Sequence, residues 1–174
     1  MSEQRNYFEL FDIPVQFKPD RSLLQRTYRK LSRQYHPDYF AQSSESEQAY
    51  ALQQTALLNK AWTIFQDEDA TIQYVLILNG VLEPEEKYSL SADFLMEVMD
   101  LNERVMEWEF EKTASEGEAI LAEVNRLKKE NYEEVASILE ETAAVSPSKE
   151  ALLRVKEYYY RNNYLKRLEK QLKS

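Results

Sequence analysis

The sequence contains no cysteine, one histidine, two glycines and five prolines among its 174 residues. The absence of cysteine excludes disulfides, thiolate nucleophiles and zinc–thiolate sites, and it suits a reducing compartment such as the cytoplasm. One histidine and scattered carboxylates do not form a transition-metal site, so we expect no bound metal. Because no glycine-rich phosphate loop or dinucleotide fingerprint occurs, we expect no cofactor and no cofactor-dependent enzyme activity.

The scarcity of glycine and proline predicts an all-α protein, with long helices joined by short loops. No run of eighteen apolar residues occurs, so we expect no membrane span. The first residues, MSEQRNYFELF, lack both the apolar core of a signal peptide and an arginine-rich presequence. These features predict a cytoplasmic protein with one medium domain or two small ones.

Capping residues and helical spacing predict four helices before residue 80. Asn6 caps the first helix, which is expected to stop at Ile13–Pro14 because the residue before proline avoids helical geometry. Ser44 and Glu47 form a capping box for the third helix, and Gly80 ends the fourth. The expected helices cover roughly residues 6–13, 20–35, 44–66 and 68–79. The expected core face of the third helix is Leu52, Ala56, Leu57, Ala61, Ile64 and Phe65.

The second helix, opened by Asp20, has two different faces. Its apolar face consists of Leu24, Thr27, Tyr28, Leu31 and Tyr35. Its opposite face is purely cationic and consists of Arg26, Arg29, Lys30 and Arg33. The whole chain carries a net charge of −9, so the charge of this face has the opposite sign to the net charge of the chain.

The chain's single histidine directly follows this helix, in the tripeptide His36-Pro37-Asp38. Pro37 forces His36 out of helical geometry, which ends the helix and stiffens the turn. A stiff turn presents Asp38 at a defined distance from the neighbouring cations. Together they suit a docking surface, in which the cations orient a partner and the carboxylate accepts a directed hydrogen bond.

Plainer interpretations compete with docking. A lone histidine at a helix end commonly compensates the helix dipole, and a cationic helix face is usually just solvated. Nucleic acid is another partner for such a face, although the net charge of −9 argues against it. Catalysis by His36 lacks a nucleophile or base nearby in the sequence.

The order of these elements resembles the J-domain family. The matching parts are NYFELFDI, RSLLQRTYRKLSRQYHPDYF and ALLNKAWTIFQDED, within residues 1 to about 78. The resemblance implies that His36-Pro37-Asp38 stimulates the ATPase of a DnaK-type chaperone. It also implies that the cationic face of the second helix contributes the electrostatic part of chaperone binding.

Three further periodic stretches follow a segment that reads as a linker. They cover about 91–113, 115–144 and 146 to the C-terminus, and they predict an antiparallel three-helix bundle. Ser115 is expected to cap the second stretch, and Ser146 the third, with Pro147 at the first helical position. The expected division is residues 1–80, a linker 81–90 and a bundle 91–174.

The first helix of the bundle carries two apolar stripes. One consists of Phe94, Val98, Leu101, Val105 and Trp108. The other consists of Leu95, Met99, Met106 and Phe110, with Met96 and Glu103 close by. The second stripe is either bundle core or a binding surface. Binding is favoured because three of the chain's four methionines lie on or near it, and methionine adapts to partners.

The stretch FLMEVMDLNE within this architecture resembles the HscB family of co-chaperones. The resemblance implies a role in iron–sulfur cluster assembly, in which the bundle binds an IscU-type scaffold and the J-domain engages an HscA chaperone. It assigns scaffold binding to Leu95, Met96, Met99, Asp100, Glu103 and an aromatic residue of the last helix, either Tyr158 or its rival Tyr159. Two alternatives remain, a general J-domain co-chaperone with another client and a helical nucleic-acid-binding protein.

Overall fold

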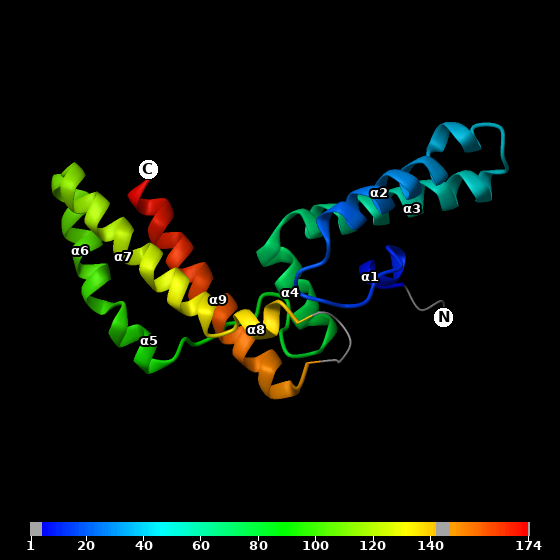
Figure 1. Ribbon diagram of the computed structural model, residues 1–174. Coiled ribbons are helices and arrows are strands. Elements are labelled where there is room, and N and C mark those ends of the chain that lie inside the picture. Colours follow the sequence, from blue (N-terminus) through cyan, green and yellow to red (C-terminus); the bar gives the residue numbers. More distant parts are fainter. Residues whose placement is uncertain (1–4, 142–146, 174) are drawn as a thin grey trace. The chain divides into compact units, whose positions relative to one another are not determined.

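The computed structural model describes residues 5–141 and 147–173, and over these ranges the chain is helical, with no strand (Figure 1). The prediction of an all-α fold is confirmed. No helix within these ranges is long and apolar enough to cross a membrane. The described residues form two compact units, an N-terminal unit that ends at Val75 and a bundle unit that begins at Leu76.

The N-terminal unit is built on a pair of antiparallel helices, α2 and α3, which lie side by side (Figure 1). The N-caps predicted at Asn6, Asp20 and Ser44 are confirmed, and each side chain accepts a hydrogen bond from the first turn of its helix. The helices of this unit are α1 (Tyr7–Leu10), α2 (Arg21–Gln34), the 3₁₀ helix η1 (Pro37–Phe40), α3 (Glu45–Gln66) and the first part of α4 (Glu68–Leu78).

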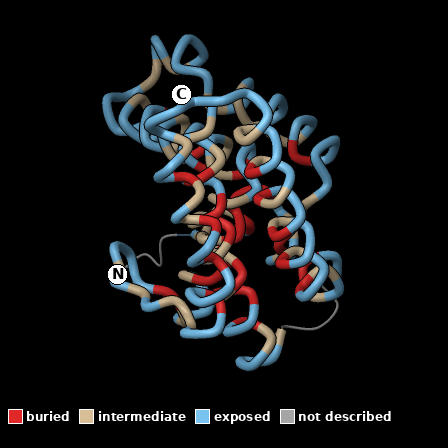
Figure 2. The backbone as a smooth tube through the Cα atoms, turned by 90° about the vertical axis from the view of Figure 1, so that its left-hand side faces the viewer, coloured by how far each residue is buried: buried red, intermediate tan, exposed pale blue. Residues whose placement is uncertain are grey.

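Aromatic side chains form the centre of this unit. The Phe65 ring lies 5.0 Å from the ring of Phe8 and 5.1 Å from that of Phe11, in tilted and edge-on arrangements that favour aromatic pairs. Buried residues recur at intervals along the helices, as amphipathic packing requires (Figure 2). The expected core face of α3 was partly wrong, since Leu52 and Ala56 are exposed. The buried residues of α3 are Ala51, Leu58, Ala61 and Phe65.

The first helix also ends earlier than its sequence predicted. Asp12 adopts a left-handed conformation with φ 53°, which stops α1 at Leu10. The Asp12 N–H donates to the Glu9 carbonyl, and the Ile13 N–H donates to the Phe8 carbonyl at 3.1 Å. This pair of bonds is a Schellman ending, in which aspartate takes the place usually held by glycine.

The bundle unit consists of three antiparallel arms around one apolar core (Figure 1). Its helices are α5 (Ala92–Glu97) and α6 (Met99–Glu111), which form one arm, α7 (Ala114–Glu133), α8 (Ala136–Leu139) and α9 (Lys149–Leu172). The core contains Phe94, Val98, Leu101, Val105, Ile120, Val124, Leu127, Leu165 and Leu168. The first apolar stripe predicted for residues 91–113 therefore packs the bundle, as expected.

The single helix predicted for residues 91–113 is interrupted at Val98. The Asn102 side-chain amide donates to the Val98 carbonyl at 2.7 Å, and the Tyr164 hydroxyl of α9 donates to the Asn102 side-chain oxygen at 2.8 Å. A side chain that bonds a backbone carbonyl four residues earlier competes with the helical ladder and bends the helix. The Val98 carbonyl also accepts the Asn102 backbone N–H at 2.9 Å, so these side-chain bonds join the break to α9 without removing that backbone bond.

The cap predicted at Ser115 is wrong, because Ser115 lies inside α7 and Thr113 occupies the N-cap position. Lys112 is left-handed, with φ 48°, and it ends α6. The indole N–H of Trp108 donates to the Thr113 carbonyl at 2.9 Å. A Cβ at Gly117 would lie 2.9 Å from the Trp108 indole nitrogen, so the glycine makes room for this contact.

The last helix starts later than predicted. Ser148 is its N-cap and accepts from the Ala151 N–H at 3.1 Å, so Pro147 precedes the helix and does not hold its first position. Ser146 and Ala144, where a cap and a helix end were expected, lie outside the described residues. The preceding helix ends at Glu133, followed by the short α8.

The segment expected to be a linker is bound to α9. Lys156 has a side chain only 11% exposed, and it donates to the Val81 carbonyl at 2.8 Å and to the Glu86 carboxylate at 2.6 Å. The Tyr88 ring stacks on Tyr160 with centroids 4.2 Å apart. Because a buried ammonium needs charged and polar partners, the contacts of Lys156 hold the segment on the bundle.

Candidate functional site

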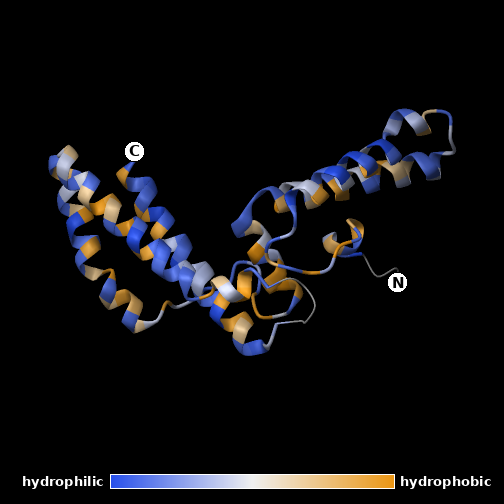
Figure 3. Cartoon of the chain, viewed as in Figure 1, coloured by the Kyte–Doolittle hydropathy of each residue, from blue (hydrophilic) through white to orange (hydrophobic). Residues whose placement is uncertain are grey.

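The cationic face of α2 points to solvent. Arg26, Arg29, Lys30 and Arg33 are all exposed, and no carboxylate in the described part of the chain lies within ion-pair distance of them. The hydropathy colouring shows α2 as mostly hydrophilic (Figure 3). These charges therefore contribute nothing to folding through internal pairs, and all of them remain available to a partner.

Contacts with α3 set the rotation of α2 that exposes these cations. Leu24 is buried, and the Tyr28 ring stacks on Trp62 with centroids 4.5 Å apart. The Tyr28 hydroxyl donates to the Asn59 side chain at 3.1 Å. With this side of α2 held by aromatic and polar contacts, the opposite side must face water.

The end of α2 and the turn after it are held by short-range hydrogen bonds. The Thr55 hydroxyl donates to the Tyr35 carbonyl at 2.9 Å, which anchors the last turn of α2 to α3. His36 is the N-cap of η1, and its Nδ1 accepts from the Asp38 N–H at 3.3 Å. This bond places the proton of a neutral His36 on Nε2, away from the turn.

Asp38 is presented outward by this turn, with its side chain 87% exposed. One carboxylate oxygen lies 3.5 Å from His36 Nδ1. Tyr39, which the sequence did not single out, is 73% exposed, and its ring lies edge-on to His36 at 6.1 Å.

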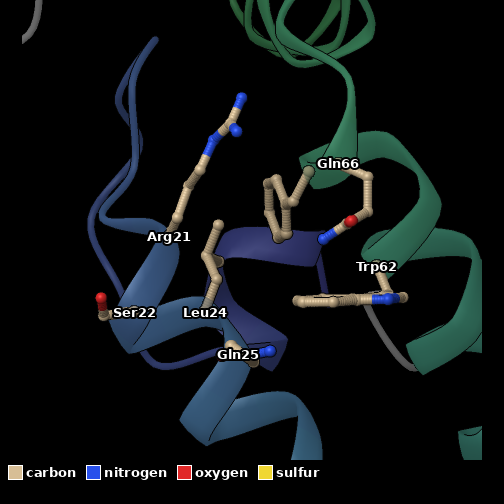
Figure 4. Close-up of a pocket in the computed structure, with 7 residues that line it drawn as sticks. Arg21, Ser22, Leu24, Gln25, Trp62 and Gln66 are labelled. Atoms are coloured by element: carbon tan, nitrogen blue, oxygen red, sulfur yellow. The ribbon is translucent and has the colours of Figure 1, made fainter.

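A hollow of about 240 Å³ lies between the first half of α2 and the end of α3 (Figure 4). Leu24 and Phe65 contribute apolar side chains, Trp62 and Gln66 come from α3, and Arg21 is the one ionisable group among the lining residues. It contains none of the residues of the His36-Pro37-Asp38 turn. A single exposed guanidinium beside neutral amides offers no means of catalysis and defines no particular ligand.

The second apolar stripe of the bundle's first arm is surface and not core. Leu95, Met96 and Met99 are 46%, 68% and 61% exposed. Asp100 and Glu103 beside them are also exposed. These five residues, which we call the proximal patch, lie across the arm from Leu101 and its core neighbours.

Tyr158, the aromatic residue assigned to the same surface, does not belong to it. Its side chain is only 7% exposed and lies edge-on to Tyr132 of α7. The residues of α9 that contact the arm carrying the patch are Arg161, whose guanidinium lies 5.2 Å from the Phe94 ring centre, and Tyr164. The structure therefore does not support Tyr158 as part of this surface, because its ring is buried against α7. Its rival Tyr159 is partly buried and lies against Tyr160.

No group of three or more histidine, aspartate or glutamate side chains suited to hold a metal ion occurs among the residues that the structure describes. The exposed features of the two units are instead charged and apolar surfaces. They are suited to contacts with other macromolecules.

Comparisons with known proteins agree with this organisation. Residues 90–173 match the family described as the HSCB C-terminal oligomerisation domain. The Co-chaperone protein HscB homolog of Vibrio cholerae serotype O1 (strain M66-2) is 42% identical over 101 residues, which are 58% of this chain and 59% of that protein. The homolog of strain ATCC 39315 / El Tor Inaba N16961 matches to the same extent. Residues 90–173 therefore carry the HscB C-terminal domain, and the chain is similar to HscB co-chaperones.

Solved structures extend the likeness to nearly the whole chain. The crystal structure of human co-chaperone protein HscB matches with a TM-score of 0.76 and 28% identity, covering 99% of this chain and 83% of that one. The chaperone HscB from Vibrio cholerae matches with a TM-score of 0.75 and 28% identity, covering 97% and 96%. The fold is therefore the one predicted, a J-domain followed by a C-terminal helical bundle. The alignments with the curated relatives span 59% of their length.

Proposed function

We propose that this protein is a cytoplasmic co-chaperone of the HscB family that joins two partners. The proximal patch binds an IscU-type iron–sulfur scaffold, and the J-domain engages an HscA-type, DnaK-like chaperone and stimulates its ATPase. Iron–sulfur cluster assembly is the process that this pairing serves. The chain itself catalyses no reaction, and ATP hydrolysis belongs to the chaperone.

One observation carries the proposal for the chaperone. The cationic face of α2 has no internal partner in the described ranges, and it leads into a turn that holds Asp38 87% exposed. A partner that brings carboxylates to α2 breaks no existing ion pair, so its Coulomb attraction is not offset by a lost one. The Asp38 carboxylate then accepts a charge-assisted hydrogen bond from a basic group of the chaperone.

The mechanism is coupling by proximity. When one chain binds the scaffold and the chaperone together, the scaffold reaches a high effective concentration beside the chaperone, even if each single affinity is modest. Stimulated hydrolysis would then trap the scaffold. His36 and Pro37 act as positioning residues in this scheme, because they hold the turn that presents Asp38.

The test is the ATPase rate of an HscA-type chaperone under single-turnover conditions, with and without the Asp38→Asn variant. We expect Asp38→Asn to abolish stimulation, because a neutral amide loses the charge-assisted bond. Asp12→Asn is the matched control, since Asp12 is also exposed in this unit and asparagine tolerates a left-handed backbone. Normal stimulation by Asp38→Asn, in a variant that unfolds at the wild-type temperature, would rule out this role of the turn.

A further inference from the structure

The exposed apolar surface of α6 continues beyond the proximal patch. Met106 is 63% exposed and Phe110 is 89% exposed. An exposed apolar side chain is common when it stands alone. Here Met106 and Phe110 extend a row of exposed apolar side chains that begins at Met99. A contiguous exposed apolar row of this kind is typical of an interaction surface.

Helical spacing places these residues on one line. At 100° per residue, Met106 and Phe110 lie within about 20° of Met99 around α6, and the line is about 16 Å long at 1.5 Å per residue. Trp108, at the centre of the core side, lies on the opposite side of the helix. We call Met106 and Phe110 the distal patch.

Acidic side chains surround both patches. The two helices of this arm carry seven carboxylates and one basic residue, Arg104, whose guanidinium is bound to Glu116 at 2.8 Å. In the described ranges no lysine, arginine or histidine lies within ion-pair distance of those seven carboxylates, which belong to Asp93, Glu97, Asp100, Glu103, Glu107, Glu109 and Glu111. The apolar row therefore lies in a negative field that this unit does not neutralise.

A hollow adjoins the distal patch at the turn between α6 and α7. Its volume is about 590 Å³, and its lining includes Trp108, Phe110, Glu107 and Glu111. The turn is held by the bond from the Trp108 indole to the Thr113 carbonyl. This depression therefore combines an apolar wall with three carboxylates, those of Glu107, Glu111 and Glu116, of which Glu116 is paired with Arg104, also in the lining. It has enough room for a side chain of a partner.

We propose that the distal patch and this hollow bind a basic, apolar segment of the scaffold client, in which lysine or arginine residues flank a large apolar side chain. The client's identity rests on the proposed function, whereas the chemistry of the segment follows from the surface. The apolar side chain covers Phe110 and enters the hollow, and the cations meet Glu107 and Glu111. A second copy docked through the same face does not fit, because it would bring one acidic surface against another.

The first experiment measures scaffold binding to the full chain by calorimetry. Met106→Ser with Phe110→Ser should weaken binding at least tenfold without lowering the melting temperature. Leu153→Ser is the matched control, because Leu153 is 47% exposed on α9, and it should bind as the wild type does. Glu107→Gln with Glu111→Gln should reduce the dependence of the affinity on salt. Wild-type affinity in the distal double variant would overturn the inference.

A second measurement separates this inference from the proposed function. The chain has two tryptophans, so in a Trp62→Phe background Trp108 reports on the hollow. A lysine–leucine peptide should shift the Trp108 emission, a glutamate–leucine peptide should not, and the Met106→Ser, Phe110→Ser variant should lose the shift. If the scaffold fails to bind the wild type while the peptide shift holds, the proposed client is wrong and the surface chemistry stands. A wild-type chain that responds equally to both peptides, or to neither, would overturn the inference.

Discussion

The two units expose surfaces of opposite charge. Among the residues that the structure describes, the charged residues of these surfaces are unpaired, whereas other charged residues form ion pairs within the fold. The four cations of α2 and the seven carboxylates of α5 and α6 have no ion-pair partners in the described parts of the chain. Other charges of the bundle unit form ion pairs, as in Lys156 with Glu86 and Lys128 with Glu169. Some charges of this chain are paired within it, whereas the two largest groups of unpaired charges described above each carry one sign and lie on surfaces suited to partners.

The two surfaces also differ in the kind of interaction they offer. The α2 face is almost purely electrostatic, with one directed acceptor at Asp38. The α5–α6 face combines charge with apolar side chains, of which Met96 is 68% exposed. We therefore expect chaperone contact to depend strongly on ionic strength, and scaffold contact to depend on both salt and buried apolar area.

The largest expected effect is a difference in folding stability between substitutions on the two sides of the arm formed by α5 and α6. Leu101 is 3% exposed in the core, so Leu101→Ala should lower the free energy of unfolding by about 2–5 kcal/mol. Leu95→Ala, Met96→Ala and Met99→Ala together should cost less than about 1 kcal/mol, because these side chains are already in water. Urea denaturation measures both. A triple variant as unstable as Leu101→Ala would show that the proximal patch is core.

The next effect concerns the unpaired cations of α2. Arg29→Gln with Lys30→Gln should weaken chaperone binding about tenfold at low salt, and the loss should shrink as salt rises. Folding stability should change by less than about 0.5 kcal/mol, because no internal ion pair is lost. Lys129→Gln on α7 removes an exposed cation that is paired with Glu133, and it serves as the control. An equal loss of chaperone affinity in the control would indicate a non-specific effect of net charge.

The smallest effect concerns a paired charge of the bundle. Hydrogen bonds from Lys128 and Lys173 lower the pKa of Glu169 to about 2, from an ordinary value of 4.5. Because the folded-state pKa is depressed, this contribution is fully present above pH 4.5 and is lost as pH falls toward 2. Glu169→Gln should therefore lower the free energy of unfolding by about 1 kcal/mol at pH 7 and by little near pH 2. The effect is modest because water partly screens the lysine partners.

Denaturation curves at several pH values measure this difference. Glu118→Gln, at an exposed position of the same unit, should follow the wild type throughout. A constant gap between Glu169→Gln and the wild type from pH 7 to pH 2 would contradict the assignment of the stabilisation to the ionised carboxylate.

Local signals in the sequence were enough for much of the fold. The caps at Asn6, Asp20 and Ser44 were predicted correctly, because each depends on a side chain that bonds its own first turn. Gly80 ends α4 with φ 67°, as its residue type indicated. The cationic side of α2 and the core stripe of α6 followed from spacing alone, since helical period determines which side chains share a face.

The errors arose where a distant residue decides the outcome. At the break the Asn102 side chain bonds the Val98 carbonyl, and its partner Tyr164 lies far along the chain in α9. The burial of Tyr158 depends on the neighbours of α9, and three consecutive tyrosines offer no local sign of which one turns inward. The second stripe of α6 had two interpretations, and only the packing of the arms distinguished them.

The sequence by itself determined an all-helical chain, most of its helix starts, and the separation of positive charge onto one helix and apolar–acidic character onto another. Those features depend on residue type and on contacts within a turn or two of helix. The tertiary structure decided which faces stay in water, where helices bend, and which charges lack partners. Exposure and pairing depend on residues far apart in the chain, whose proximity arises only when the helices pack.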